Sequence, residues 1–169
     1  MKTGVSTSAP CLVVTACLTI SCAAPVDGPK FQYVESRACS DLIVYTWNER
    51  LTEYLVIEGD LKRLGIPLGS TRTLEIASAG NPLSVRVDMY QEQASYPHCS
   101  DVVFDDKPTA WHATSGTMTI TRSTEQLVPS TYRISITVAS LVFEGPRGQR
   151  VRVAGPITLS GLGGTSPSG

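Results

Sequence analysis

A two-residue alternation of apolar and polar side chains is the feature that most limits what this chain can fold into. In Thr114–Arg122, Met118 and Ile120 alternate with threonines, and Thr71–Ala77 and Leu83–Tyr90 alternate in the same way. Successive side chains of a β-strand point to opposite faces, so this pattern predicts strands with one buried face. No stretch sustains a 3.6-residue period, which favours an all-β fold.

Further strands are predicted from β-branched and aromatic runs between turn residues. In the longest run the alternation breaks at Ala139-Ser140, so Leu141 and Phe143 continue inward only across a bulge. About eight short strands predict an antiparallel two-sheet β-sandwich over residues 33–160, with a small barrel as the alternative. The additional strands expected are Asp41–Asn48, Glu53–Gly59, Val102–Phe104, Thr131–Glu144 and Gln149–Leu159.

The beginning of the chain has the marks of an export signal. Residues 9–24 are almost all small or apolar and follow a short N-terminus whose only charged side chain is Lys2. A positive start, an apolar middle and small residues at the exit are typical of a secretory signal peptide. The apolar part is about 12 residues, too short for a membrane-spanning helix. A buried N-terminal helix or strand is the alternative interpretation.

The residues Leu18–Ser21 before Cys22 resemble the lipobox of bacterial lipoprotein precursors, and Val13–Ala16 before Cys17 fit it as well. The resemblance implies that a diacylglycerol is joined to the cysteine thiol and that the peptide is cut before that cysteine. We favour Cys22, because it leaves a fuller apolar region. Ala23 follows it, which in this family implies the outer membrane in a cell with two membranes. A plain signal-peptidase cut near Ala23, giving a soluble secreted protein, remains open.

This interpretation divides the chain into a lipoprotein signal peptide at 1–21, a tether at 22–32, the β-domain at 33–160 and a disordered tail at 161–169. Cys11 and Cys17 would leave with the signal and Cys22 would carry lipid. Cys39 and Cys99 then remain, and two thiols in an exported domain most simply form a disulfide. This disulfide would close a loop of about 60 residues, which stabilises the folded state by about 4 kcal/mol in the chain-entropy model.

Charge excludes one class of partner. Loss of Lys2 with the signal leaves 13 basic and 15 acidic side chains, a net charge of −2. Nucleic-acid binding needs a concentrated basic face, which this composition does not provide. There is no polybasic run for anionic lipid either, so we expect the N-terminal lipid to provide membrane attachment.

Few residues suggest chemistry. His98 and His112 flank Asp101, Asp105 and Asp106, and such residues could converge on a divalent cation, but they form no recognised ligand motif. There is no activated nucleophile, phosphate loop or cofactor motif, so we assign no catalytic residue, metal ligand or cofactor. The acidic residues of the strands are interpreted as solvated surface charges; they are Glu35, Asp41, Glu53, Glu58, Glu75 and Asp88.

Two further features bear on binding. Tyr45 and Trp47 share one face of a strand and, if exposed, could stack on sugars or anchor a protein; we favour Trp47 in the core between the sheets. Arg150 and Arg152 share a strand face near Arg147 and are interpreted as a solvated, charged edge.

The residues Ser115–Ile120 and the long strand after them are similar to the closing strands of small envelope β-sandwich lipoproteins of unknown function. That resemblance implies a fold and no activity. The sequence predicts an exported, lipid-anchored envelope protein that is not an enzyme and that binds a protein or glycan or has a structural role. The alternative is an envelope hydrolase or metal-dependent enzyme that uses the His98–His112 segment.

Overall fold

The structure is a computed structural model, and it describes residues 28–76, 82–95, 97–99, 106–124 and 131–164. Within these ranges the regular structure is entirely β-strand and contains no helix, so the all-β prediction is confirmed. The strands are β1 (Glu35–Cys39), β2 (Ile43–Trp47), β3 (Glu53–Gly59), β4 (Thr71–Glu75), β5 (Leu83–Met89), β6 (Thr109–Arg122), β7 (Thr131–Glu144), β8 (Arg150–Arg152) and β9 (Ile157–Gly164).

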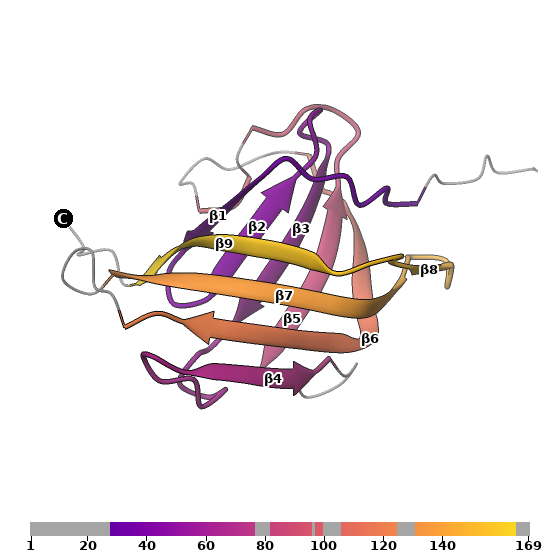
Figure 1. The fold of residues 1–169 in the computed structure, drawn as a ribbon. Coiled ribbons are helices and arrows are strands. Elements are labelled where there is room, and N and C mark those ends of the chain that lie inside the picture. The colour runs from indigo at the N-terminus through magenta and orange to yellow at the C-terminus, as the bar shows by residue number, and fades with distance from the viewer. Residues whose placement is uncertain (1–27, 77–81, 96, 100–105, 125–130, 165–169) are drawn as a thin grey trace, which may run out of the picture.

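All these strands belong to one antiparallel hydrogen-bonded sheet. Its main order is β1-β2-β3-β5-β6-β7-β8, with β4 also paired to β6 and β9 also paired to β7. Strands β6 and β7 are long enough to pair with different neighbours along their length: the first part of β6 pairs with β5 and the last part with β4. In Figure 1, β4, β6, β7 and β9 form a front layer that crosses the steeply inclined β1, β2, β3 and β5 behind it.

The sheet nearly closes on itself where β9 meets β1. The Ser36 hydroxyl donates to the Ser160 carbonyl at 2.7 Å, and the Gly164 N–H donates to the Ser40 carbonyl at 2.7 Å. The fold is therefore nearly closed and barrel-like, rather than clearly the two-sheet sandwich that was predicted. The reason is the length of β6, which pairs with β4 of one layer and β5 of the other and keeps the hydrogen bonding unbroken.

A bulge lets these strands bend. The register of β6 against β7 shifts on both sides of Ser115, opposite the end of β7. Gly116 has φ +144°, and a side chain there would meet the Ala139 carbonyl oxygen at 3.0 Å. Ser140 has φ +55°, and Leu141 and Phe143 remain fully buried beyond it. The predicted bulge is therefore present, and it preserves the inward face of β7.

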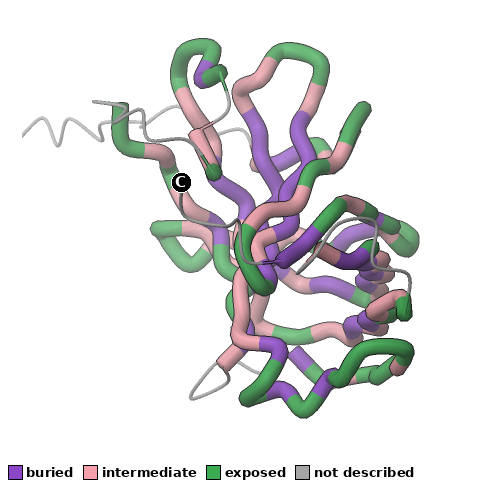
Figure 2. The backbone as a smooth tube through the Cα atoms, turned by 90° about the vertical axis from the view of Figure 1, so that its left-hand side faces the viewer, coloured by how far each residue is buried: buried purple, intermediate pink, exposed green. Residues whose placement is uncertain are grey.

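The main core fills the space between the layers, where purple segments of the tube face one another in Figure 2. Its largest fully buried side chains come mainly from β3, β6 and β7. They include Trp111, Phe143, Leu55, Ile57, Met118, Ile120, Ile134 and Ile136.

The segment 28–34 packs against one end of the body. Glu53 is only 4% exposed, and its carboxylate accepts hydrogen bonds of 2.9 Å from the backbone N–H groups of Lys30 and Phe31. The Phe31 ring stacks on Phe143 with 5.3 Å between the centroids. The folded body therefore begins before residue 33, inside the predicted tether at 22–32, because a buried carboxylate holds that backbone.

Both ends of the strand prediction need correction. β1 was not predicted, because its sequence, ESRAC, lacks an apolar alternation. At the other end β9 continues to Gly164, so the predicted tail at 161–169 begins inside a strand. Glycine suits this strand because a side chain at Gly161 would lie 2.6 Å from the Ala38 backbone nitrogen. The predicted strand at Val102–Phe104 lies outside the described residues.

Candidate functional site

A second apolar cluster lies on the outer face of the β1–β2–β3–β5 layer, opposite the main core. Strand register places Tyr45 beside Val56 and Trp47 beside Tyr54. These side chains alternate with inward-facing ones such as Leu55, so they must point away from the main core. They are nevertheless almost fully buried, with Trp47 4% exposed and Tyr54 not exposed. The interpretation that Trp47 packs in the core between the layers is therefore wrong.

The cover over this cluster is the segment after β5, which we call the cap: residues 90–95 and 97–99. The Tyr90 N–H donates to the Thr52 carbonyl at 2.8 Å, and the Ala94 N–H donates to the Leu51 carbonyl at 2.9 Å. The Tyr54 hydroxyl donates to the Ala94 carbonyl, and Ala94 is buried within the cluster. The start of the cap is thus held by backbone and side-chain bonds at the β2–β3 turn.

A disulfide between Cys39 and Cys99 holds the other end of the cap. It joins the last residue of β1 to the last described residue of the cap, with the Cα atoms 6.0 Å apart and a sequence separation of 60. The predicted pairing of these cysteines is therefore present. The cross-link closes the cap over the aromatic cluster and fixes it to an edge of the sheet.

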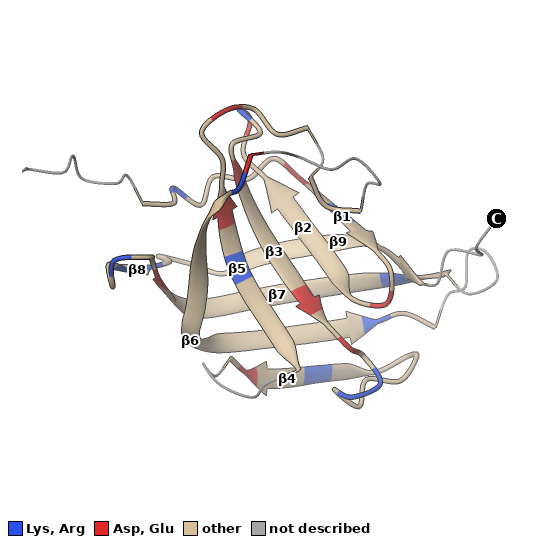
Figure 3. Cartoon of the chain, turned by 180° about the vertical axis from the view of Figure 1, so that it is seen from behind, with Lys and Arg blue, Asp and Glu red and all other residues tan. Residues whose placement is uncertain are grey.

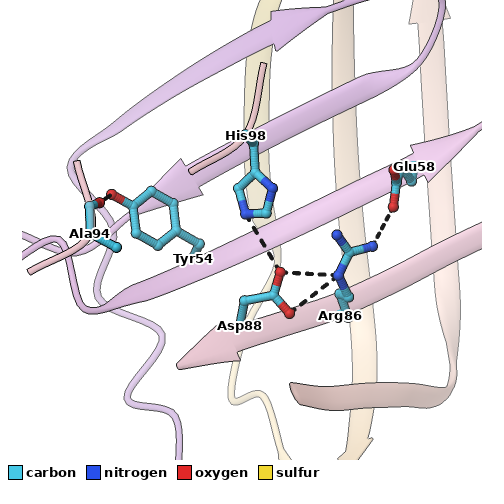
Figure 4. A network of polar contacts seen from close by, with 6 residues as sticks. All are labelled: Tyr54, Glu58, Arg86, Asp88, Ala94 and His98. Atoms are coloured by element: carbon cyan, nitrogen blue, oxygen red, sulfur yellow. Dashed lines mark hydrogen bonds and ion pairs between the residues drawn. The ribbon is translucent and has the colours of Figure 1, made fainter. Parts of the chain in front are cut away.

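Charged residues lie on β5 beside the cluster, marked by red and blue bands in Figure 3, and the register with β3 places them on the outer face. Figure 4 shows the connected group of Glu58, Arg86, Asp88 and His98. The Arg86 guanidinium donates from Nε to both oxygens of Asp88, at 3.0 and 3.2 Å, and from Nη1 to Glu58. The cap contributes His98, whose Nε2 lies 3.5 Å from Oδ2 of Asp88.

Burial controls the electrostatics of this network. Asp88 is 3% exposed, and burying a carboxylate is unfavourable unless a cation or donor compensates it, a role that Arg86 fills here. The His98 ring packs against Tyr45 and Tyr54, with centroids 5.4 and 5.6 Å away. Burial lowers the pKa of His98, against the opposing effect of the Asp88 charge. Burial and the nearby Asp88 charge raise the pKa of Tyr90 to about 12.

The predicted metal-binding alternative is not assembled in the described part of the chain. His98 faces Asp88, whereas His112 is exposed on β6, in register with Arg86 on one side and Glu144 on the other. Asp101 and Asp105 lie outside the described residues. Within those residues, no group of three or more His, Cys, Asp or Glu side chains is placed to hold a metal ion.

The network lies beside His98 of the cap, which packs against the outer face of the sheet. A carboxylate beside an imidazole is one part of an acid–base pair, but its use on a substrate needs access to solvent. Here the imidazole is only 12% exposed and packs against two tyrosine rings, and its neighbour Cys99 is oxidised. Asp88 and His98 thus bring β5 and the cap close together, whereas the disulfide joins β1 to the cap covalently.

Sequence reasoning missed the buried role of two carboxylates, Glu53 and Asp88, which were interpreted as solvated surface charges. For Asp88 a signal was present, because Arg86 lies two residues earlier and therefore on the same strand face. For Glu53 the partners are backbone N–H groups more than 20 residues away in sequence. No local pattern reports such a contact.

Comparison with known proteins gives no further assignment. No family model matches the chain, and no curated protein or solved structure shows significant similarity to it. The described residues include no helix of the length and apolarity needed to span a bilayer.

Proposed function

We propose that this protein is an exported, lipid-anchored component of a bacterial cell envelope, with a binding or structural role. The observation that carries the proposal is the disulfide between Cys39 and Cys99. Disulfides persist in oxidising compartments outside the cytoplasm and are rare inside it. A barrel-like body with a cross-linked cap suits that environment, because the disulfide that closes the cap persists there.

The lipid anchor rests on the sequence of the first residues. Cys22 is the proposed lipidated residue, with residues 1–21 removed, and the acyl chains would hold the domain at a membrane, taken to be the outer membrane where there are two. Simple secretion after a cut near Ala23 is the competing arrangement. A protein or glycan partner would be held close to the membrane surface, because only residues 23–27 separate the anchor from the first described residue.

Mass spectrometry of the protein purified from membranes tests both parts of this proposal. The expected mature chain begins at a diacylated Cys22 and contains Cys39 and Cys99 as a disulfide, two hydrogens lighter than the dithiol. If the protein from these cells retains residues 1–21, or carries Cys39 and Cys99 as free thiols, the proposal that it is exported is overturned. A chain that begins at Ala23 or Ala24 without lipid would overturn the anchor and leave export in place.

A further inference from the structure

The turn between β7 and β8 carries a group of arginines on an exposed hairpin. Arg147 lies in the turn, and Arg150 and Arg152 lie on β8, all of them exposed. The turn is tightly formed, since the Gly148 N–H donates to the Gly145 carbonyl at 3.0 Å and Gly148 has φ +73°. We call residues 144–152 the basic hairpin.

Only part of this charge is neutralised. Glu144 pairs with Arg150, with Arg150 Nη2 2.9 Å from Oε2. That pair is solvated, because the Arg150 side chain is 70% exposed, and exposed pairs contribute little. No described carboxylate forms an ion pair with Arg147 or Arg152. The hairpin therefore presents a local excess of positive charge, visible as the blue turn at β8 in Figure 3, on a domain whose total charge is slightly negative.

The chain enters the folded body directly beside this hairpin. A side chain at Gly28, the first described residue, would lie 3.3 Å from Val151 of β8 and 3.4 Å from the Trp111 ring. In Figure 1 the indigo segment before β1 extends to the side of the molecule where β8 lies. The entry point and the basic hairpin are therefore on the same end of the barrel.

Distance then limits where a lipid anchor at Cys22 can lie. The six steps from Cys22 to Gly28 reach at most about 22 Å when fully extended. Anionic headgroups attract lysine and arginine near a membrane surface by about 1 kcal/mol per residue, within roughly a Debye length. A hairpin held this close to the bilayer would meet those headgroups.

From this geometry we infer that the basic hairpin is a membrane-contact surface that binds anionic lipid headgroups beside the anchor and orients the domain. The inference rests on the proposed lipid anchor for its orienting role. Arg147, Arg150 and Arg152 would supply the charge.

Hydrogen exchange of the mature protein bound to lipid vesicles tests whether the basic hairpin contacts the membrane. The vesicles contain phosphatidylcholine alone or with about 30 mol% phosphatidylglycerol. Backbone amides of residues 144–152 are expected to exchange more slowly on the anionic vesicles, and about 0.5 M salt should remove the difference. Amides in the loop at 60–66, at the other end of the barrel, should not change.

Variants separate the hairpin from total charge. The substitution of Arg147, Arg150 and Arg152 by Gln should abolish the slowing and lower the preference for anionic vesicles about fivefold per arginine. Replacement of the same residues by Lys should preserve both effects. The matched control, K62Q/R63Q/R133Q, removes equal charge elsewhere on the exposed surface and should behave like the unchanged protein.

The outcomes distinguish this inference from the anchor itself. Equal exchange on both vesicle types in a protein shown to carry lipid overturns the hairpin surface and leaves the anchor. If the Gln triple variant and the K62Q/R63Q/R133Q control lose the preference for anionic vesicles equally, the inference is also overturned, since total charge would then explain the binding. Mass spectrometry can instead find no lipid on the protein. In that case, binding to anionic vesicles that is sensitive to salt and is lost in the Gln triple variant supports the membrane-contact surface without the anchor. Absence of binding in that case overturns both.

Discussion

At the scale of single residues, Glu53 and Asp88 are the buried acidic side chains of the described chain, and they are compensated differently. Backbone N–H groups of segment 28–34 compensate Glu53, whereas the guanidinium of Arg86 compensates Asp88. A buried charge that loses its partners is strongly destabilising. Glu53 therefore holds the N-terminal segment by hydrogen bonds, whereas Asp88 is bonded within β5 by Arg86 and has the cap residue His98 3.5 Å away.

Replacement of Glu53 by Gln should loosen segment 28–34. The amide presents one acceptor oxygen in place of two, so one of the N–H groups of Lys30 and Phe31 loses its partner at a cost of about 1–3 kcal/mol. Hydrogen exchange should accelerate at these two amides, and urea unfolding should show a lower free energy. Glu49→Gln, an exposed change in the same turn region, is the control and should leave both measurements unchanged. If the two amides are as well protected in the Glu53 variant as in the natural protein, the stacking of Phe31 alone holds the segment.

The stability of the protein should fall as the pH drops below the usual pKa of histidine. Burial lowers the pKa of His98 in the folded protein, so the unfolded chain binds the proton first. The stability contributed by neutral His98 is complete above about pH 6.5 and is lost progressively as the pH falls toward the lowered folded pKa. The slope from this one group is at most about 1.4 kcal/mol per pH unit. Urea unfolding between about pH 7.5 and 5 measures it.

Two variants check that this pH dependence belongs to His98. His98→Gln should be less stable than the natural protein at neutral pH and should have a shallower pH slope. His112→Gln, exposed on β6, should retain the original slope. If stability rises on acidification through pH 6, the negative charges of Asp88 and Glu58 raise the pKa of His98 more than burial and the Arg86 charge lower it.

At the scale of elements, the cap shows how a short irregular segment can convert an outer sheet face into a second core. Tyr45 and Trp47 would be exposed on the bare sheet, because they point away from the main core. The cap buries them with few apolar side chains of its own, among them Ala94. Its attachment therefore depends on bonds at its two ends, of which the disulfide is the covalent one.

Removal of the disulfide by Cys39→Ser and Cys99→Ser should open the cap. The loss of the cross-link should lower the free energy of unfolding by about 2–4 kcal/mol. Acrylamide should then quench Trp47, which the cap covers, more than Trp111, which lies in the main core. The same double substitution in a Trp47→Phe protein identifies Trp47 as the source of the extra quenching, which should be absent from that protein. Unchanged quenching after the loss of the disulfide would mean that the bonds of Tyr90 and Ala94 suffice.

The elements also show where sequence reasoning reached its limit. The alternation of Met118 and Ile120 with threonines specified their strand correctly, because one face of that strand is buried and the other is solvated. The same argument failed for Trp47, since period-two patterns report which residues share a face but not what covers that face. It missed β1, which is held by its neighbours β2 and β9 and not by an apolar face. The cap itself has no pattern that predicts where it folds.

At the scale of the whole molecule, the all-β class followed from the sequence, but β1, the division of Gln149–Leu159 between β8 and β9 and the near closure of the sheet did not. Closure depends on contacts between β1 and β9, which are more than 110 residues apart, and on the continuity of β6 and β7 through the bulge. The cysteines that pair were predicted from number and compartment. The network on β5 and the basic hairpin became recognisable only when strands distant in sequence were placed side by side.

The seam between β1 and β9 can be tested at one glycine. A side chain at Gly161 would lie 2.6 Å from the backbone nitrogen and the Cβ of Ala38, closer than real contacts allow. Gly161→Ala should therefore separate the strands and destabilise the protein by about 1–3 kcal/mol, the range typical of overpacking. Amides of β1 should exchange faster, while those of β3 should change only with global stability. Gly155→Ala, with no atom within 4 Å of the added carbon, should stay within about 0.5 kcal/mol of the natural protein. If both variants retain full stability, the seam is not closely packed and the sheet is open at that edge. If only Gly161→Ala loses stability, the contact between β1 and β9 holds the barrel-like body closed.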